Sequence, residues 1–373
     1  MPWKASRGSE IASQSDLRVA VAGAGAFGRN HLRVYRELES AGLGVSLAAA
    51  VEPDPARAAD AAAKYNIPVF PTAEKLLAAD LELDAASVAV PTVHHRDVAL
   101  ELLAARLDLL IEKPLGASLN EADEIVAQAA KNGRIIQPGH LERFNPAVMA
   151  VEPKLRRPMF FEAHRLSVFT PRSLDVDVVL DLMIHDLDIV LTFARSAVSE
   201  VRAVGLPIVS PNVDIANVRV EFESGCVANF TASRVSTETV RKLRFFEPRQ
   251  YVSIDYARRD LLVIGIDANI PPEIAAAIAA HKLDAAALAK LAAAAAATGG
   301  PAPGLSFKKP EITPGEPLRL ELESFLDAVR TRREPRVTAQ QGRNALALAL
   351  EIQATMADHA QRAGLKDFFK GSF

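Results

Sequence analysis

The sequence predicts an α/β protein in which an N-terminal, doubly wound parallel sheet is followed by an α+β domain with a large, mostly antiparallel sheet. Apolar strand patterns alternate with helical patterns, through short links, over residues 17–140. Over residues 198–254, strand-like runs follow one another directly and are separated by turn signals such as Ser224-Gly225. The length of 373 residues also suits two domains, at about 150 residues each.

The elements of the first domain follow from short apolar runs that end at turn residues. The first run, LRVAVA, is partly β-branched and is followed at once by Gly23, which is typical of a buried strand. We expect strands at 17–22, 45–51, 85–90, 107–111 and 134–137, and helices at 27–40, 56–65, 94–106 and 118–132. Apolar strands of this kind belong to a parallel sheet that is covered by helices on both faces and connected by right-handed crossovers.

The second domain has a different pattern. We expect helices at 145–156, 178–194, 316–330 and 338–362, and strands at 159–168, 198–209, 213–222, 226–235, 240–246 and 251–254. The Pro- and Gly-rich residues 299–315 indicate a loop, and the alanine-rich run 285–297 indicates a helix because alanine has the highest helix propensity. The predicted division is a disordered tail (1–16), a first domain (17–140) and a second domain (141–373), whose final helices can pack back on the first.

Composition excludes several classes of function. Lys and Arg total 43 against 46 Asp and Glu, so the chain lacks the basic character of a nucleic-acid-binding protein. Its single cysteine, Cys226, cannot form a disulfide framework or a zinc cluster, and indicates a reducing cytoplasm. Residues 1–16 contain no apolar signal segment, and the alanine-rich run is too short to span a membrane. Neither nucleic acid nor a membrane is therefore expected as a partner.

Three glycines form a G-x-G-x-x-G turn between the first strand and the first helix. Gly23 permits the tight turn, Gly25 lets the backbone approach a pyrophosphate, and Gly28 lets the helix and strand pack closely. Ala26 and Phe27 complete the turn, where the helix N-terminus offers free N–H groups to the anion. The alternative interpretation is a tight strand–helix turn without a ligand.

Glu52 ends the second strand, 24 residues after Gly28. A carboxylate there can accept hydrogen bonds from the adenosine ribose hydroxyls and would repel a 2′-phosphate, which favours NAD over NADP. Arg57 lies nearby and can tolerate a phosphate, so NADP stays open. The alternative for Glu52 is an exposed carboxylate at a strand end.

Four motifs in order carry a resemblance: GAGAFGRNH (23–31), VEPDP (51–55), PTVHH (91–95) and EKP (112–114). With them the chain resembles the Gfo/Idh/MocA oxidoreductase family from about residue 17 to its C-terminal helices. The resemblance implies a Rossmann domain, a nicotinamide cofactor and oxidation or reduction of a sugar or cyclitol hydroxyl. It also implies cofactor contacts for Pro91, Thr92, His95, Glu112 and Lys113. For His95 the alternative is a polar residue at a helix N-terminus.

Two further stretches resemble the nucleotide-sugar branch of this family, and within it the UDP-N-acetylglucosamine 3-dehydrogenases: GHLERFNPA (139–147) and DVVLDLMIHDLDIV (177–190). The chain departs from the family pattern in having Glu52 where Asp is frequent, Thr92 where Asn is frequent, and an alanine-rich insert at 273–298. A free sugar or inositol is the alternative substrate, and a non-catalytic, dinucleotide-binding regulator is the alternative function.

The catalytic prediction rests on Lys113, Asp181 and His185. Lys113 lies just past the end of the fourth strand, where ligands of open α/β sheets bind, and its ammonium can stabilise alkoxide character. Asp181 and His185 are four residues apart, so a helix would place them on one face, and histidine suits proton transfer near neutrality. The family pattern has a Lys and an Asp-x-x-x-His pair. We assign His185 as base and Lys113 as polariser, although this division varies within the family.

The alternatives are a surface lysine for Lys113 and a satisfied helix histidine beside Asp186 for His185. No metal site is expected. Predicted substrate residues are the following: His140, Arg143, Asn145, Arg165 and Arg172. The two last arginines suit a diphosphate. Their alternative is ion pairing, and for Arg143 and Asn145 it is a salt bridge and a helix cap. An uncovered sheet face in the second domain predicts a homodimer or homotetramer.

Overall fold

The computed structural model describes residues 16–170, 176–266 and 305–365. Most of the predicted tail, Arg172 and the alanine-rich stretch lie outside these described residues. The chain divides into two compact units. The first comprises the residues up to Gly139 together with 318–343, and the second comprises 140–317 together with the residues from 344 onward. The predicted fold class is confirmed in both.

The first unit is built on a six-stranded sheet in which every pairing is parallel, as predicted. Its order is β3-β2-β1-β4-β5-β6, with β1 (Leu17–Ala22), β2 (Val45–Val51), β3 (Val69–Phe70), β4 (Ala85–Val88), β5 (Asp108–Glu112) and β6 (Ile136–Gly139). Strands β4, β5 and β6 are buried at every position, as expected of parallel strands that are covered on both faces. Strand β3 was not predicted because two residues carry no periodicity.

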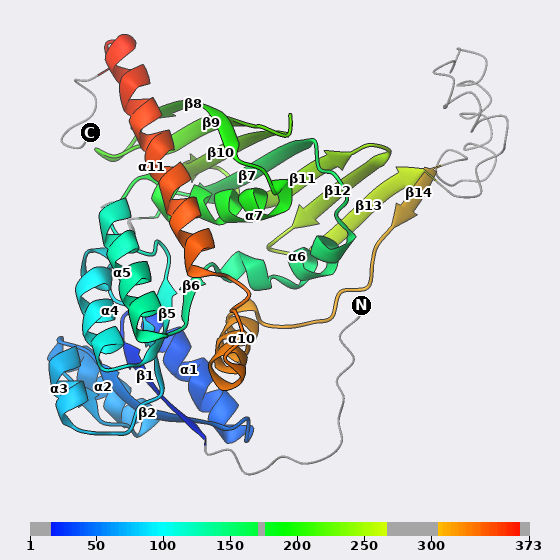
Figure 1. The fold of residues 1–373 in the computed structure, drawn as a ribbon. Helices are drawn as coiled ribbons and strands as arrows, with labels where there is room; N and C mark the ends of the chain where they lie inside the picture. Colours follow the sequence, from blue (N-terminus) through cyan, green and yellow to red (C-terminus); the bar gives the residue numbers. More distant parts are fainter. Residues whose placement is uncertain (1–15, 171–175, 267–304, 366–373) are drawn as a thin grey trace, which may run out of the picture. The chain divides into compact units, whose positions relative to one another are not determined.

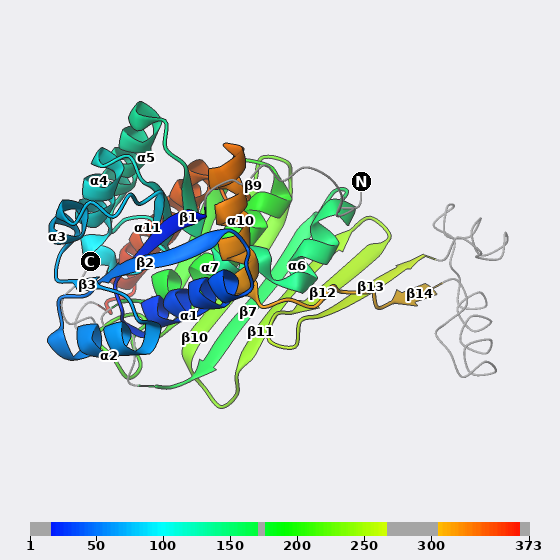
Figure 2. The same ribbon diagram turned by 90° about the horizontal axis from the view of Figure 1, so that it is seen from below.

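Helices cover both faces of this sheet. Figure 2 shows the sheet between α1 (Ala26–Ser40) and α2 (Pro55–Tyr65) on one side and α3 (Ala73–Ala78), α4 (His95–Ala104) and α5 (Leu119–Asn132) on the other. Side-chain caps explain where three of these helices begin: Asp54, Thr72 and Ser118 each accept a backbone N–H three residues ahead. Helix α10 (Pro317–Thr331) belongs to this unit from Leu318 on, and Gln137 of β6 donates to its Glu321 carbonyl at 3.0 Å.

The second unit contains an eight-stranded sheet of order β14-β13-β12-β11-β7-β10-β9-β8 (Figure 1). Its strands are β7 (Phe160–Val168), β8 (Val198–Leu206), β9 (Ile215–Phe222), β10 (Val227–Ser236), β11 (Val240–Glu247), β12 (Gln250–Asp255), β13 (Asp260–Ile266) and β14 (Leu305–Lys308). The β7–β10 pairing is parallel and the others are antiparallel. The prediction of a mostly antiparallel sheet is therefore confirmed.

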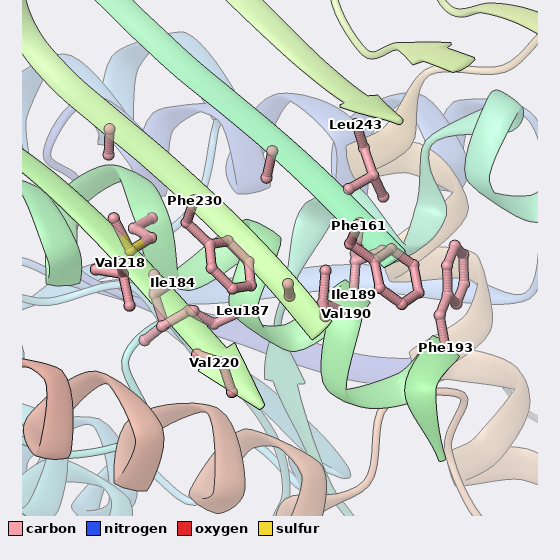
Figure 3. Close-up of a cluster of buried hydrophobic side chains, with 14 of the residues drawn as sticks. Phe161, Ile184, Leu187, Ile189, Val190, Phe193, Val218, Val220, Phe230 and Leu243 are labelled. Atoms are coloured by element: carbon pink, nitrogen blue, oxygen red, sulfur yellow. The ribbon is translucent and has the colours of Figure 1, made fainter. Parts of the chain in front are cut away.

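The core of the second unit lies between one face of this sheet and helix α7 (Ile184–Ala194). Figure 3 shows Ile184, Leu187 and Val190 of this helix among Phe161 and Phe230 of the strands, and all five are almost completely buried. Helix α11 (Ala339–Arg362), which the division cuts after Arg343, adds further apolar side chains to the same core from residue 345 on. The core thus fixes the helix that carries the predicted His185.

Several predicted boundaries were wrong. The helix predicted at 178–194 begins with a π-helical turn, Val179–Met183, before α7. The helix predicted at 145–156 is α6 (Pro146–Val151) followed by a 3-10 turn (Glu152–Lys154). Another 3-10 turn, Leu141–Phe144, precedes it. Strand β14 lies where a loop was predicted. Among the described helices, none has the combination of length and hydropathy that crossing a membrane would require.

Candidate functional site

Each glycine of the turn after β1 is required for a different reason. Gly23 has a φ of 98°, and a Cβ atom there would lie 2.6 Å from the Ala89 carbonyl oxygen. A Cβ atom at Gly28 would lie 1.8 Å from the Gly23 carbonyl oxygen, so only glycine lets α1 approach β1. A Cβ atom at Gly25 would meet nothing within 4 Å, so the space above this residue is open. This is the arrangement that a pyrophosphate requires.

Helix α1 begins at this open position. Gly25 is its N-cap, no side chain caps the first turn, and the first turn carries no acidic residue. Ala26 and Phe27 are exposed there, Phe27 with 46% of its surface. Because the first N–H groups of a helix lack partners within it, this end can hold an anionic phosphate. The turn therefore fits the pyrophosphate of a dinucleotide.

Glu52 is buried, and its carboxylate is fully engaged with the chain. It accepts the Ala24 N–H at 2.8 Å, the Asp54 N–H at 3.0 Å and an Arg57 guanidinium N–H at 2.9 Å. Burial raises the pKa of Glu52, but the hydrogen bonds from Arg57 and the two amides outweigh burial and hold the pKa below its usual value. The predicted alternative of an exposed strand-end carboxylate is wrong, since only 3% of the side chain is exposed.

The segment after β4 carries the predicted Pro91, Thr92 and His95. Pro91 precedes a 3-10 turn, Thr92–His94, and His95 begins α4. The His95 ring is buried, with Nδ1 2.9 Å from the Pro114 carbonyl and Nε2 2.9 Å from the Val90 carbonyl. Burial lowers the pKa of His95, although these carbonyls act in the opposite direction. The neutral ring has a single N–H and donates it to one of these two carbonyls. The cofactor contact of His95 stays a prediction.

Glu112 is the last residue of the buried strand β5, Lys113 follows it, and the Lys113–Pro114 peptide bond is cis. The Glu112 carboxylate lies 2.9 Å from Nε2 of His31, whose side chain is completely buried in α1. His31 was not predicted as a functional residue. His31 is the last residue of the motif GAGAFGRNH, three positions after Gly28. A lone histidine on an apolar helix face gave no reason to connect it with Glu112.

In the second unit, Asp181 lies in the π-helical turn and His185 in the first turn of α7; both are half-buried. The turn is fixed by Asp177, whose Oδ1 accepts the N–H groups of Val179 and Leu180 at 2.8 and 3.0 Å. The prediction that a regular α-helix sets the spacing of Asp181 and His185 is therefore wrong at Asp181. π-helical turns occur frequently at functional sites.

Arg165 is committed to carboxylates within the second unit. Its Nε and Nη2 donate to the two oxygens of Asp186 at 2.7 and 3.1 Å, and Nη1 donates to Glu142 at 3.1 Å. The Tyr256 ring centroid lies 5.1 Å from the guanidinium carbon. Burial opposes the charge, but Asp186 and Glu142 raise the pKa of Arg165 well above its usual value. This geometry matches the ion-paired alternative, and contact of Arg165 with a substrate diphosphate stays a prediction.

The segment 140–145 is also fastened inside the second unit. The Asn145 Oδ1 accepts the Ala147 N–H at 3.1 Å and caps α6. Arg143 donates to the Thr192 hydroxyl and lies 3.6 Å from Asp188, which is 3.9 Å from His140 Nδ1. The salt-bridge and cap alternatives thus describe the observed contacts of Arg143 and Asn145. Substrate contacts of His140, Arg143 and Asn145 stay predictions, and Arg172 lies outside the described residues.

The two units therefore carry different chemistry. The first offers a dinucleotide cradle and places Lys113 at the carboxyl end of β5, and the second places Asp181 and His185 within one helical segment. The predicted meeting of Lys113 with His185 stays a prediction. Within the parts of the chain that the structure describes, no group of three or more His, Cys, Asp or Glu side chains is arranged to hold a metal ion.

Comparison with known families gives two consecutive matches. The family described as "Oxidoreductase family, NAD-binding Rossmann fold" matches residues 17–140, and the GFO/IDH/MocA C-terminal domain matches residues 148–247. The chain is 32% identical over 347 residues to UDP-N-acetylglucosamine 3-dehydrogenase of Acidithiobacillus ferrooxidans, covering 93% of this chain and 99% of that protein. It is 30% identical over 202 residues to an inositol 2-dehydrogenase of Acidothermus cellulolyticus, covering 52% of this chain and 58% of that one.

Solved structures agree with this comparison. The structure of the Acidithiobacillus ferrooxidans enzyme matches with a TM-score of 0.77 at 30% identity, over 92% of this chain and 98% of that one. A levoglucosan dehydrogenase in complex with NADH matches with a TM-score of 0.76 over the same share of this chain. Its 15% identity supports the fold alone.

Proposed function

The chain belongs to the Gfo/Idh/MocA family of NAD-binding oxidoreductases, and we propose that it oxidises a ring hydroxyl of a nucleotide sugar, as a UDP-N-acetylglucosamine 3-dehydrogenase. One observation carries the choice of substrate class. Similarity to the nucleotide-sugar enzyme extends over 99% of that protein, whereas the inositol dehydrogenase of comparable identity is matched over 58%. The stretches 139–147 and 177–190, on which the nucleotide-sugar interpretation was based, lie within the second unit.

The chain's own residues are proposed to divide the reaction as follows. The turn of Gly23, Gly25 and Gly28 holds the pyrophosphate on the N-terminus of α1, and Glu52 faces the adenosine ribose. When bound, NAD supplies the acceptor for the hydride that leaves the sugar carbon. Lys113 donates a hydrogen bond to the reacting oxygen and stabilises its developing negative charge.

The remaining steps are assigned to the second unit. The His185 imidazole takes the hydroxyl proton, and Asp181 orients the imidazole or holds a neighbouring hydroxyl. Both residues are proposed to act in the same reaction as Lys113. The buried contacts of Arg165 with Asp186 and Glu142 support this assignment, because they restrain Asp186, the residue that follows His185.

The test is NAD reduction with a panel of substrates. UDP-N-acetylglucosamine is expected to give NADH, whereas free N-acetylglucosamine and myo-inositol are not. Replacing Lys113→Met or His185→Asn is expected to lower kcat by roughly 10²- to 10⁴-fold, with NADH binding retained in His185→Asn. Turnover of inositol in place of the UDP-sugar would favour the alternative substrate. Full activity of both variants would contradict the assigned residues.

We also propose a cytoplasmic homodimer or homotetramer. The single cysteine, Cys226, is buried and not paired, and burial raises its pKa to about 11, so it is an unreactive thiol suited to a reducing compartment. The oligomer is proposed from the outer face of the eight-stranded sheet, which is discussed below. Cell fractionation with an antibody against the protein tests the location.

A further inference from the structure

We infer that His31 is a positioning residue for Lys113, acting through Glu112. The inference rests on the proposed function only in the role that it gives to Lys113. His31 belongs to the helix that begins at the glycine turn, and Glu112 is the residue immediately before Lys113. The contact between them therefore joins the phosphate-binding helix to the catalytic strand end.

The contact is short and buried. Nε2 of His31 lies 2.9 Å from Oε1 of Glu112, with 0% of the histidine side chain and 10% of the glutamate side chain exposed. An ionised carboxylate only accepts hydrogen bonds, so Nε2 carries the hydrogen and donates it. A charge-assisted hydrogen bond of this kind, shielded from water, restricts the Glu112 side chain more than an exposed contact would.

Gly139 closes the other side of Glu112. A Cβ atom at position 139, the end of β6, would lie 3.0 Å from the Cα, Cδ and Oε2 atoms of Glu112. The side chain is thus held between His31 of α1 and the backbone of β6. A movement of His31 is therefore expected to shift Glu112, whose side chain has little room on the Gly139 side.

The residue on the other side of Lys113 is held in a similar way. The Pro114 carbonyl lies 2.9 Å from the buried ring of His95. Lys113 is consequently flanked by Glu112, which is tied to the glycine-turn helix, and by Pro114, whose carbonyl lies against the buried His95 ring of the segment after β4. Such a backbone can place an ammonium within the narrow tolerance that transition-state stabilisation requires.

If the His31–Glu112 hydrogen bond only stabilised the fold, its loss would lower stability without a specific effect on Lys113. A positioning pair predicts that kcat falls, that the KM for the substrate changes little, and that the reactivity of the Lys113 amine changes. It also predicts recovery by a side chain that restores the donor at the position of Nε2.

The experiment compares His31→Leu, which removes the donor, with His31→Gln, whose amide nitrogen can replace Nε2. A matched control is Tyr35→Phe, one turn further along α1, which removes a buried hydrogen bond to Ser87 at 2.8 Å without touching Glu112. For His31→Leu we expect kcat to fall roughly 10- to 100-fold, with kcat close to wild type in His31→Gln and Tyr35→Phe. The unfolding temperature is measured for all three.

A second readout does not depend on turnover. Each full-length protein, loaded with NAD, is treated with a trace amount of an amine acylating reagent, and labelling of Lys113 relative to the exposed Lys131 is measured by peptide mass spectrometry. We expect faster labelling of Lys113 in His31→Leu, because a less restrained side chain is more accessible, and unchanged labelling in the control. If His31→Leu does not fold, Gly139→Ala displaces Glu112 without altering His31 and is expected to give the same changes.

Unchanged kcat and unchanged Lys113 labelling in a folded His31→Leu protein would overturn the inference, as would an equal effect of Tyr35→Phe. If the wild-type protein turns over no UDP-sugar, the proposed substrate fails. The labelling result then still decides whether His31 controls Lys113.

Discussion

At the scale of single residues, Glu52 and Arg57 are the residues proposed to control the adenosine end of the dinucleotide cradle. The carboxylate points into the glycine turn and accepts the Ala24 amide, while Arg57 bonds to it from the outside with half of its side chain exposed. Because the pKa of Glu52 is lowered, the carboxylate stays ionised at neutral pH and repels a 2′-phosphate. Arg57 offsets part of that repulsion.

We therefore expect the two residues to change cofactor preference in opposite directions. Arg57→Ala should increase the preference for NADH over NADPH, and Glu52→Gln should decrease it, each by about tenfold, equivalent to about 1.4 kcal/mol. Dissociation constants from fluorescence titration with both cofactors measure this. A ratio that moves in the same direction in both variants would show that neither residue faces the ribose.

The role of a residue could be predicted from the sequence where that role depends on the backbone. The spacing of Gly23, Gly25 and Gly28 predicts what each glycine permits, and in the structure a Cβ atom would clash with the backbone at Gly23 and Gly28 and meet open space at Gly25. Contacts between side chains could not be predicted, because histidine and arginine patterns do not say which way a side chain points. His31 was missed for this reason, and Arg165 has carboxylate partners that are distant in the sequence.

At the scale of elements, different glycines of the turn after β1 serve folding and cofactor binding. A methyl group at Gly28 would collide with the Gly23 carbonyl, whereas one at Gly25 would meet open space. We expect Gly28→Ala to destabilise the protein by several kcal/mol. Gly25→Ala should leave the unfolding temperature nearly unchanged but weaken NADH binding at least tenfold, since its methyl group would occupy the pyrophosphate position. Thermal unfolding with and without NADH distinguishes the two effects.

The loop between β8 and β9 depends on a single carboxylate. Asp214 is buried and accepts the N–H groups of Ile208, Val209 and Ser210 at 2.7 to 2.9 Å. Burial raises the pKa of Asp214, but hydrogen bonds from the Ser210 hydroxyl and these amides outweigh burial and lower the pKa. The contribution of Asp214 to stability is therefore complete above its unfolded pKa of about 3.9 and is lost as the pH falls through the lower folded value.

Asp214→Asn should accordingly lower the free energy of unfolding at neutral pH by about 1–3 kcal/mol. Between pH 4 and the folded pKa, the wild type should lose more stability than the variant. Denaturant unfolding at a series of pH values measures both. Parallel stability curves for the two proteins across the acid range would contradict this role.

Most long elements with strong patterns were predicted, but β13 (Asp260–Ile266) was missed in spite of its apolar run, and several short or irregular elements were missed as well. The five longer strands of the first sheet follow from their apolar runs, and β3 has too few residues for a pattern. The π-helical turn at Val179–Met183 uses the same residue types as an α-helix, so its sequence gave no sign of the different hydrogen bonding. Strand β14 lies beside a Pro- and Gly-rich stretch and is defined by its pairing with β13, a tertiary contact.

At the scale of the whole molecule, the outer face of the eight-stranded sheet has a continuous apolar row. The strand register pairs each side chain of this row with the next across five neighbouring strands: Phe160, Phe246, Tyr251, Ile264 and Phe307. The ring centroids of Phe160 and Phe246 are 5.5 Å apart, and those of Phe246 and Tyr251 are 5.1 Å apart. Alternation along β11 directs Phe246 away from the core that contains Phe245.

This row is the basis for the proposed oligomer. Phe246 and Phe307 are 36% and 51% exposed in the single chain, and a contiguous apolar row of this length is unfavourable in water. A second copy of the chain, placing its own row on this face, would bury it around a two-fold axis. Phe246→Glu should then introduce a charge into the interface, where its burial without a partner is strongly unfavourable.

We expect Phe246→Glu to convert the oligomer to a smaller species, measured by light scattering during size-exclusion chromatography. Leu43→Glu, at an exposed apolar residue of the first unit, makes the same change in charge and should leave the mass unchanged. Because neither substitution touches the glycine turn or Lys113, NADH binding should survive in both. A wild-type protein that is already monomeric, or a Phe246→Glu protein of unchanged mass, would show that this face is not where two copies meet.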